Sequence, residues 1–372
     1  MIIAMKKLAI PAVAAVFLPV MAAAQVKPVD RPVIAVPPAP PTSNAQALIV
    51  WHVQSVHCAD ADLPETAVLL PRPAFGWMQM GPQPRVTLDF TVADGRPIDI
   101  RPVGATYTPN ADDLAPALAV SGFTGAHRDC RVSYVATRTP IAMANALDLI
   151  SATMESRPSA EVIDRMKPAN SDCLGHVPAP LLRGFPDFTK LKGSVGRQQW
   201  SMVQFDIDAA GKPTGIRTLT GSNDAGLDVA ARDAVAKSRF VPGKRIGCLY
   251  PYWKSASPRP APDFPDRQSF RPDSATCPVE LDWVVKPVLQ YPQNYRKRAI
   301  EGWAIIGFDA APWGATGNVR VLAAEPSTDF GTAAVNIVSA ARLAPSNRGY
   351  VGCVERVRYV MAPPDGVDPA AN

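Results

Sequence analysis

Apolar and polar residues alternate in three short segments of the chain, each centred on a phenylalanine. This period of two is typical of a β-strand that turns one face toward a core. The residues predicted to face inward are Leu88, Phe90 and Val92, then Val203, Phe205 and Ile207, then Ile306, Phe308 and Ala310. Asp89, Gln204, Asp206 and Asp309 fall on the opposite faces.

A turn with glycine follows each of these segments, at Gly95, Gly211 and Gly314. Glycine adopts positive φ without a Cβ clash, which suits the turn of a β-hairpin. Five residues after each glycine stands a β-branched residue followed by arginine, namely Ile100-Arg101, Ile216-Arg217 and Val319-Arg320. We therefore predict three hairpins, and we interpret the arginines as a solvated face.

Each hairpin is followed by apolar residues at helical spacing. The helices are predicted from Leu114, Ala117 and Leu118 in the first copy, from Leu227, Ala231 and Val235 in the second, and from Phe330, Ala334 and Ile337 in the third. Asn223 or Asp224 can cap the second helix. Each helix ends on an apolar residue: Phe123, Phe240 or Leu343.

The six cysteines fall into three pairs that bracket these features. Cys58 and Cys130, Cys173 and Cys248, and Cys277 and Cys353 are 72, 75 and 76 residues apart. Such a repeat indicates three copies of one unit. Six cysteines permit fifteen pairings, and the repeat favours the three pairs just named, one disulfide in each unit. Buried free thiols are one alternative. The other is a zinc site built from His57, Cys58, His127 and Cys130, with His176 close to Cys173.

Proline, with 40 of 372 residues, separates the units and excludes long helices. We predict a signal peptide at 1–24, a proline-rich linker at 25–46, the first unit at 47–140, a helical linker at 141–168, the second unit at 169–256, a proline-rich linker at 257–272, the third unit at 273–362 and a disordered tail at 363–372. The net charge of +5 is too low to indicate nucleic-acid binding.

The N-terminus has the pattern of an export signal. Lys6 and Lys7 precede an apolar stretch from Leu8 to Ala24 that ends in small residues. Cleavage would place the protein in the periplasm, where disulfides form. The alternative is an uncleaved anchor in the inner membrane, which is the one circumstance in which membrane contact is expected.

Signatures of catalysis are missing from the sequence. It contains no G-x-S-x-G, H-E-x-x-H or G-x-x-x-x-G-K motif, and all four histidines precede residue 177. We expect a protein that is not an enzyme and that uses no cofactor.

The second unit resembles the C-terminal domain of the TonB energy-transducer family. The resemblance rests on Phe205-Asp206-Ile207-Asp208, Gly211, the helix from Leu227, and Arg239-Phe240-Val241-Pro242-Gly243. The third unit is similar through Tyr291-Pro292, Tyr295 and Arg298-Ala299-Ile300-Glu301-Gly302, followed by its strand, hairpin and helix. The first unit is included through the internal repeat alone. The resemblance implies an α+β fold in which each unit is a three-stranded antiparallel sheet packed against helices.

In that family the domain binds an extended segment of an outer-membrane receptor at the sheet edge. The contact residues that the resemblance implies here are Tyr291, Pro292, Arg298, Val354, Arg356, Arg358 and Val360. An edge strand has unpaired N–H and C=O groups, so an extended peptide can add to it. Charged residues that simply keep this edge soluble, or a neighbouring unit that covers it, are the competing interpretation.

Two functions follow from the sequence. The first is a periplasmic protein that binds receptor segments by strand addition, within TonB-dependent transport. The second is an envelope module without energy coupling, with peptidoglycan as a further partner. The apolar N-terminus departs from the family anchor because it lacks serine and histidine, and this departure counts against force transduction more than against the fold.

Overall fold

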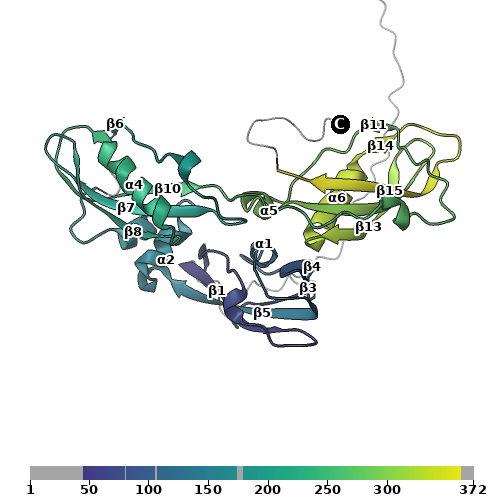
Figure 1. Cartoon of the computed structure of the whole chain (residues 1–372), viewed down its shortest axis with the longest axis horizontal. Helices are drawn as coiled ribbons and strands as arrows, with labels where there is room; N and C mark the ends of the chain where they lie inside the picture. Colours follow the sequence, from purple (N-terminus) through teal and green to yellow (C-terminus); the bar gives the residue numbers. More distant parts are fainter. Residues whose placement is uncertain (1–44, 80, 105–106, 174–178, 362–372) are drawn as a thin grey trace, which may run out of the picture. The chain divides into compact units, whose positions relative to one another are not determined.

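The computed structural model describes residues 45–79, 81–104, 107–173 and 179–361 (Figure 1). The predicted signal peptide, nearly all of the first proline-rich linker, His176 and the predicted tail at 363–372 lie outside the described residues. Within these ranges, no helix combines the length and the apolar character that a membrane span requires.

The first unit contains one antiparallel sheet of five strands, in the order β2-β1-β5-β3-β4. The strands are β1 (Gln46–His57), β2 (Ala74–Trp77), β3 (Arg85–Ala93), β4 (Arg96–Pro102) and β5 (His127–Pro140), with η1 (Glu65–Ala67) and α1 (Leu114–Ala119). The prediction of three strands was therefore incomplete for this unit. β5, β3 and β4 are the expected three, and β1 and β2 extend the sheet beyond β5.

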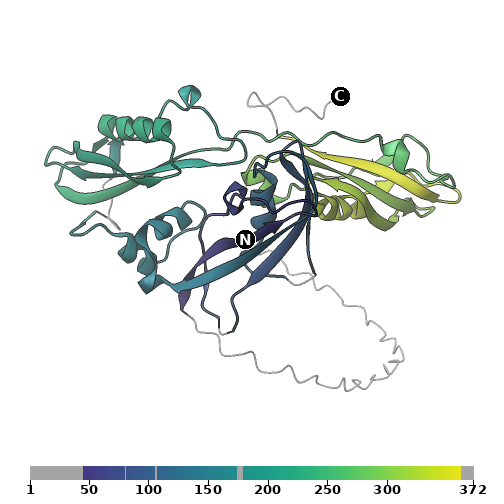
Figure 2. The same ribbon diagram turned by 60° about the horizontal axis from the view of Figure 1, so that its bottom comes forward.

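The second unit has the expected three-stranded sheet, in the order β10-β7-β8. Its elements are β6 (Pro180–Leu182), η3 (Phe188–Lys190), β7 (Gln199–Ile207), β8 (Pro213–Gly221), α4 (Ala225–Lys237), β9 (Arg239–Phe240) and β10 (Arg245–Lys254). Figure 2 shows α4 lying along one face of this sheet, where it contacts β7 and β8. Asp224 caps α4 by accepting the Leu227 N–H at 2.8 Å, as one of the two predicted caps.

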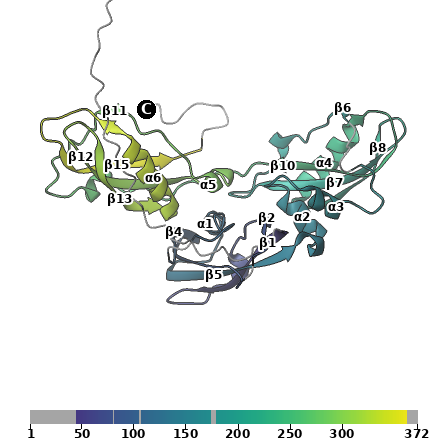
Figure 3. The same ribbon diagram turned by 180° about the vertical axis from the view of Figure 1, so that it is seen from behind.

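The third unit has the same architecture, with strand order β13-β12-β15. Its elements are η4 (Arg267–Phe270), β11 (Trp283–Val285), α5 (Gln293–Lys297), β12 (Gly302–Ala310), β13 (Thr316–Glu325), α6 (Thr328–Ala340), β14 (Arg342–Leu343) and β15 (Tyr350–Tyr359). Helix α6 packs on β12 and β13, and Figure 3 shows it from behind.

One cross-strand pair recurs in all three sheets and explains the spacing of phenylalanine and cysteine in the sequence. Phe90 lies opposite Cys130, Phe205 opposite Cys248, and Phe308 opposite Cys353. All three phenylalanines are buried. Equivalent strands of the three units are therefore β3, β7 and β12 in the centre, with β5, β10 and β15 beside them.

The predicted disulfides are confirmed. Each unit has its own bond, between Cys58 and Cys130, Cys173 and Cys248, and Cys277 and Cys353. The zinc alternative fails in the first unit because both of its sulfurs are bonded to each other. The His57 and His127 rings there lie against Asp62 and Asp60, at 2.6 and 2.8 Å.

The hairpin glycines occupy the same place in each unit, where only glycine fits. The Phe240 N–H donates to the Gly211 carbonyl at 2.9 Å, and the equivalent bonds join Phe123 to Gly95 and Leu343 to Gly314. Gly211 has φ +81°, and a Cβ there would lie 2.1 Å from the Phe240 carbonyl oxygen. This contact holds the end of the helix against the hairpin, because positive φ and close approach both exclude a side chain.

The segment predicted as a helical linker folds into three short helices, η2 (Ile141–Met143), α2 (Ala146–Ala152) and α3 (Ala160–Met166). The segment is therefore helical in three short pieces, and Leu147 on α2 is exposed. Buried residues of these helices form a second core with residues from β1, β7 and β10. This core contains Leu48, Ile141, Leu149, Ile150, Val162, Met166, Trp200, Met202 and Leu249.

Candidate functional site

Strand β15 lies at one edge of the third unit's sheet. It pairs with β12 from Gly302 opposite Tyr359 to Ala310 opposite Tyr350. Among the described residues, no strand pairs with its other side. An edge strand presents a row of N–H and C=O groups to which an extended segment can add.

Buried and exposed side chains alternate along the second half of β15. Val357 and Tyr359 are buried against the helix side, with 7% and 0% of their surface exposed. Arg356 and Arg358 are exposed on the opposite face. Val354 is half-buried, and Val360 follows directly after the strand.

Tyr291 and Pro292 support the far end of β15 from the helix side. The Tyr291 hydroxyl donates to the Ile300 carbonyl at 2.6 Å, and its ring meets Tyr359 edge to face with centroids 5.4 Å apart. Burial raises the pKa of Tyr291 well above its ordinary value, so this hydroxyl remains a donor. Pro292 precedes α5 and accepts the Arg296 N–H at 3.0 Å. Tyr291 therefore lies against the buried face of the strand, and Pro292 lies at the start of α5.

Arg298 lies away from β15, although the family resemblance grouped it with that strand. Its Nε and Nη2 atoms bind both oxygens of Asp113, at 2.7 and 2.6 Å, and only 14% of its side chain is exposed. Burial raises the pKa of Asp113, while the bonds from Arg298 oppose that shift. The structure thus engages Arg298 with a carboxylate of the first unit.

The linker before Cys277 contacts the third sheet, which sequence reasoning did not predict. The Phe264 ring packs on Trp303 with centroids 4.9 Å apart, and the Arg356 guanidinium lies 4.8 Å from the Phe264 centroid. The Trp303 indole N–H donates to the Pro262 carbonyl at 3.0 Å. An aromatic residue between two prolines, Phe264 in Pro262-Asp263-Phe264-Pro265, is the signal that could have indicated this contact.

The two carboxylate oxygens of Glu355 accept hydrogen bonds at the free edge of β15. Its Oε1 accepts the N–H of Arg356 at 2.7 Å, which shows that this N–H points away from β12. Its Oε2 accepts the Trp283 indole N–H at 3.2 Å. Arg267 of η4 lies 3.8 Å from the same carboxylate. The edge is therefore covered by side chains and by η4, but it is not paired with a strand.

The equivalent edge of the first unit carries a strand from the same chain. β1 pairs antiparallel with β5, from Ala47 opposite Pro140 to His57 opposite Arg131. β5 is the counterpart of β15, because Cys130 and Cys353 hold the same cross-strand position. This fold therefore accepts an antiparallel strand at that edge.

Comparison with known families agrees with the geometry of the second and third units. The family described as Gram-negative bacterial TonB protein C-terminal matches residues 190–249 and 287–360. These two segments belong to the TonB C-terminal domain family. Strand β15 is the last strand of the second matched segment. No curated protein matches the chain.

The first unit lies outside the segments that match the family. Its relation to the TonB C-terminal domains rests on the shared register of Phe90 with Cys130 and on its disulfide. The first unit has two further strands, β1 and β2, beyond β5. Among the described residues, the sheets of the second and third units have no strand at the equivalent edge.

Proposed function

We propose that this protein acts in the bacterial envelope by binding an extended segment of an outer-membrane receptor at β15, as part of TonB-dependent transport. The pairing of β1 with β5 is the observation that carries the proposal. It places an antiparallel strand on the same edge of the same fold, with no change of the sheet behind it.

The exposed residues of β15 suit such a segment. Arg356 and Arg358 add positive charge beside the edge, and the outward N–H of Arg356 is held only by the flexible side chain of Glu355. A partner strand would replace Glu355 as the acceptor. Phe264 and η4 would have to move aside, because they pack on the same strand.

Binding of a receptor peptide to two variants tests the proposal. Fluorescence anisotropy with a labelled N-terminal segment of an outer-membrane receptor would give the affinity for the full chain. Arg356→Pro removes the outward N–H, and an edge strand tolerates proline at such a position. We expect a loss of about tenfold or more, because a missing backbone bond and a clash both oppose pairing.

Arg356→Ala is the matched control, since it removes the same side chain and keeps the N–H. Its affinity should fall much less than that of Arg356→Pro. Equal binding by the two variants, with both folded by circular dichroism, would contradict strand addition at β15.

We also propose that the protein is exported to the periplasm and cleaved after Ala24. The basic start and the apolar stretch to Ala24 support this, as do three disulfides in one chain. N-terminal sequencing of the protein from the periplasmic fraction should begin at Gln25. Retention of Lys6 to Ala24 in an inner-membrane fraction would contradict cleavage and favour an anchored transducer.

A further inference from the structure

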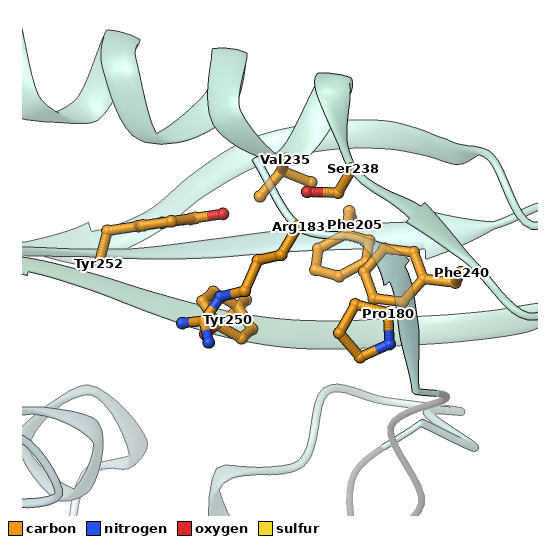
Figure 4. Close-up of a pocket in the computed structure, with 8 residues that line it drawn as sticks. All are labelled: Pro180, Arg183, Phe205, Val235, Ser238, Phe240, Tyr250 and Tyr252. Atoms are coloured by element: carbon orange, nitrogen blue, oxygen red, sulfur yellow. The ribbon is translucent and has the colours of Figure 1, made fainter. Parts of the chain in front are cut away.

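A small cavity opens in the second unit between β6, α4 and β10 (Figure 4). It measures about 40 Å³ and has an apolar floor. Eight residues line it: Pro180, Arg183, Phe205, Val235, Ser238, Phe240, Tyr250 and Tyr252. Figure 4 shows the Arg183 side chain lying across the Tyr250 ring at one side of this space.

The third unit fills the equivalent position with a side chain of its own. Trp283 lies opposite Leu343 in the β11–β14 pair, and its ring stacks on Phe308 with centroids 5.7 Å apart. Its indole N–H donates to Glu355 at 3.2 Å. The third unit thus shows what this part of the fold accepts: an aromatic ring next to a carboxylate.

The second unit lacks both of these groups. Pro180 lies opposite Phe240 in the β6–β9 pair, so it takes the place of Trp283. Tyr250, two residues after Cys248, takes the place of Glu355, two residues after Cys353. Phe240 stacks on Phe205 with ring centroids 5.5 Å apart, which replaces part of the contact that Trp283 makes with Phe308 in the third unit. The cavity remains beside it.

Arg183 provides a cation at the mouth of the cavity. Its guanidinium lies 4.5 Å from the Tyr250 centroid and 4.8 Å from the Phe185 centroid. The side chain is exposed, and no carboxylate pairs with it among the described residues. Because Arg183 lines the cavity and its long side chain is exposed, we expect its rotation to enlarge the cavity enough to admit a ring.

The surface around the cavity is apolar and basic. Leu181, Leu182 and Phe185 are exposed by 68%, 58% and 60%. Residues 180–256 contain twelve Lys and Arg against six Asp and no Glu. This balance favours an acidic partner, because opposite charge speeds and orients association.

We propose that this cavity binds an aromatic side chain from an acidic peptide segment of a partner protein. The ring would lie against Phe205 and Tyr250, and a neighbouring carboxylate would pair with Arg183. The chain's own segments 25–44 and 362–372 contain no Phe, Tyr or Trp, so they cannot supply the ring. This site is separate from β15 and does not depend on strand addition there.

Fluorescence anisotropy with the full chain tests the site directly. The probe is a fluorescein-labelled peptide of sequence GDWDG, and the comparison peptides are GDADG and GKWKG. We expect saturable binding of GDWDG and binding at least about tenfold weaker for both others, because each lacks one of the two recognised groups. Equal binding of the three peptides would overturn the proposal.

Matched variants locate the binding to the second unit. Arg183→Gln should weaken GDWDG binding by about five- to tenfold. Lys286→Gln changes the residue at the equivalent position of the third unit, directly after β11, and should leave the affinity unchanged. The proposed site would be contradicted if Arg183→Gln bound GDWDG as tightly as the unchanged chain, or if both variants lost affinity equally.

Pro180→Trp copies the third unit and should abolish binding by filling the cavity from within. Arg183→Gln keeps the test decisive if the tryptophan variant does not fold. Sedimentation of the unchanged chain adds a further outcome. Self-association that Pro180→Trp removes would mean that a second copy occupies the cavity, and this would overturn the assignment to an acidic partner.

Discussion

The first and third units treat the same sheet edge in opposite ways. In the first unit β1 pairs along β5 for the length of the strand, and its Trp51 is buried in the core. In the third unit the preceding segment contributes η4 and Phe264, which lie against β15, and a single backbone hydrogen bond from Thr276 to Val351, but among the described residues it adds no strand. A paired strand is part of the fold, whereas a side-chain cover can be displaced. The comparison explains why we propose β15, rather than β5, as the edge that binds a partner.

Removal of a disulfide should have the largest effect on the free energy of unfolding. The loss should be similar in the second and third units. Replacing Cys277 and Cys353 together by alanine should lower the free energy of unfolding by about 4 kcal/mol, because the bond closes a long loop in the unfolded chain. Denaturant unfolding would measure the loss.

The Cys173 and Cys248 pair is the matched control for that measurement, since it closes a loop of nearly the same length. The two double variants should lose similar stability. A large difference between them would break the equivalence of the units on which the comparison rests.

Removing the buried Trp51 side chain of β1 should have the next largest effect on the free energy of unfolding. Trp51 is buried, and its indole N–H donates to the Asn110 carbonyl at 2.8 Å. Trp51→Ala should lower the free energy of unfolding by about 3 kcal/mol, through lost packing and a cavity. Trp77→Ala, on β2 of the same sheet but exposed, should change it little. Equal free energies of unfolding for the two variants would show that β1 contributes little to the stability of the sheet.

A pH-dependent contact joins the two units under comparison. The Glu325 carboxylate accepts the Asp99 N–H of β4 at 2.8 Å, and burial raises the pKa of Glu325 to about 7. Between about pH 4.5 and 7 the folded protein therefore holds a proton that the unfolded chain releases. Stability should fall by roughly 2 kcal/mol as pH rises through this window.

Unfolding curves recorded between pH 4 and 8 would show that fall. Glu325→Gln should flatten the pH dependence, because it keeps a neutral side chain at every pH. Glu280→Gln, at an exposed position, should leave it unchanged. A Glu325→Gln variant with the original pH dependence would show that another group titrates.

The smallest effect on stability should come from the cover of β15. Phe264 is half-buried, so Phe264→Ala should cost about 1 kcal/mol in the free energy of unfolding. The same variant should bind the receptor peptide about threefold more tightly, because less cover must be displaced. Trp313→Ala, which changes an exposed aromatic residue of the third unit, should alter neither quantity. Weaker peptide binding by Phe264→Ala would mean that Phe264 contacts the partner.

The sequence was sufficient for features that repeat or that follow a local period. The inward faces around Phe90, Phe205 and Phe308, the cap at Asp224 and the three disulfides were all predictable, because each depends on spacing within one unit. The three copies also reduced fifteen cysteine pairings to one, since equivalent residues share one geometry.

Contacts between distant segments could not be predicted in the same way. The pairing of β1 with β5, the packing of Phe264 on Trp303 and the ion pair between Arg298 and Asp113 join residues far apart in sequence. No local period specifies such partners. The cavity beside Arg183 was missed for a related reason, because the exchange of Trp283 for Pro180 is visible only once the strands are aligned.

Amide hydrogen exchange on β15 tests the central claim most directly. We predict that the outward amide of Arg356 exchanges readily in the free protein and becomes protected when the receptor peptide binds. Amides of β5 on the side facing β1 should be protected in both states, because their strand is already in place. Peptide binding that leaves exchange along β15 unchanged would contradict strand addition at this edge.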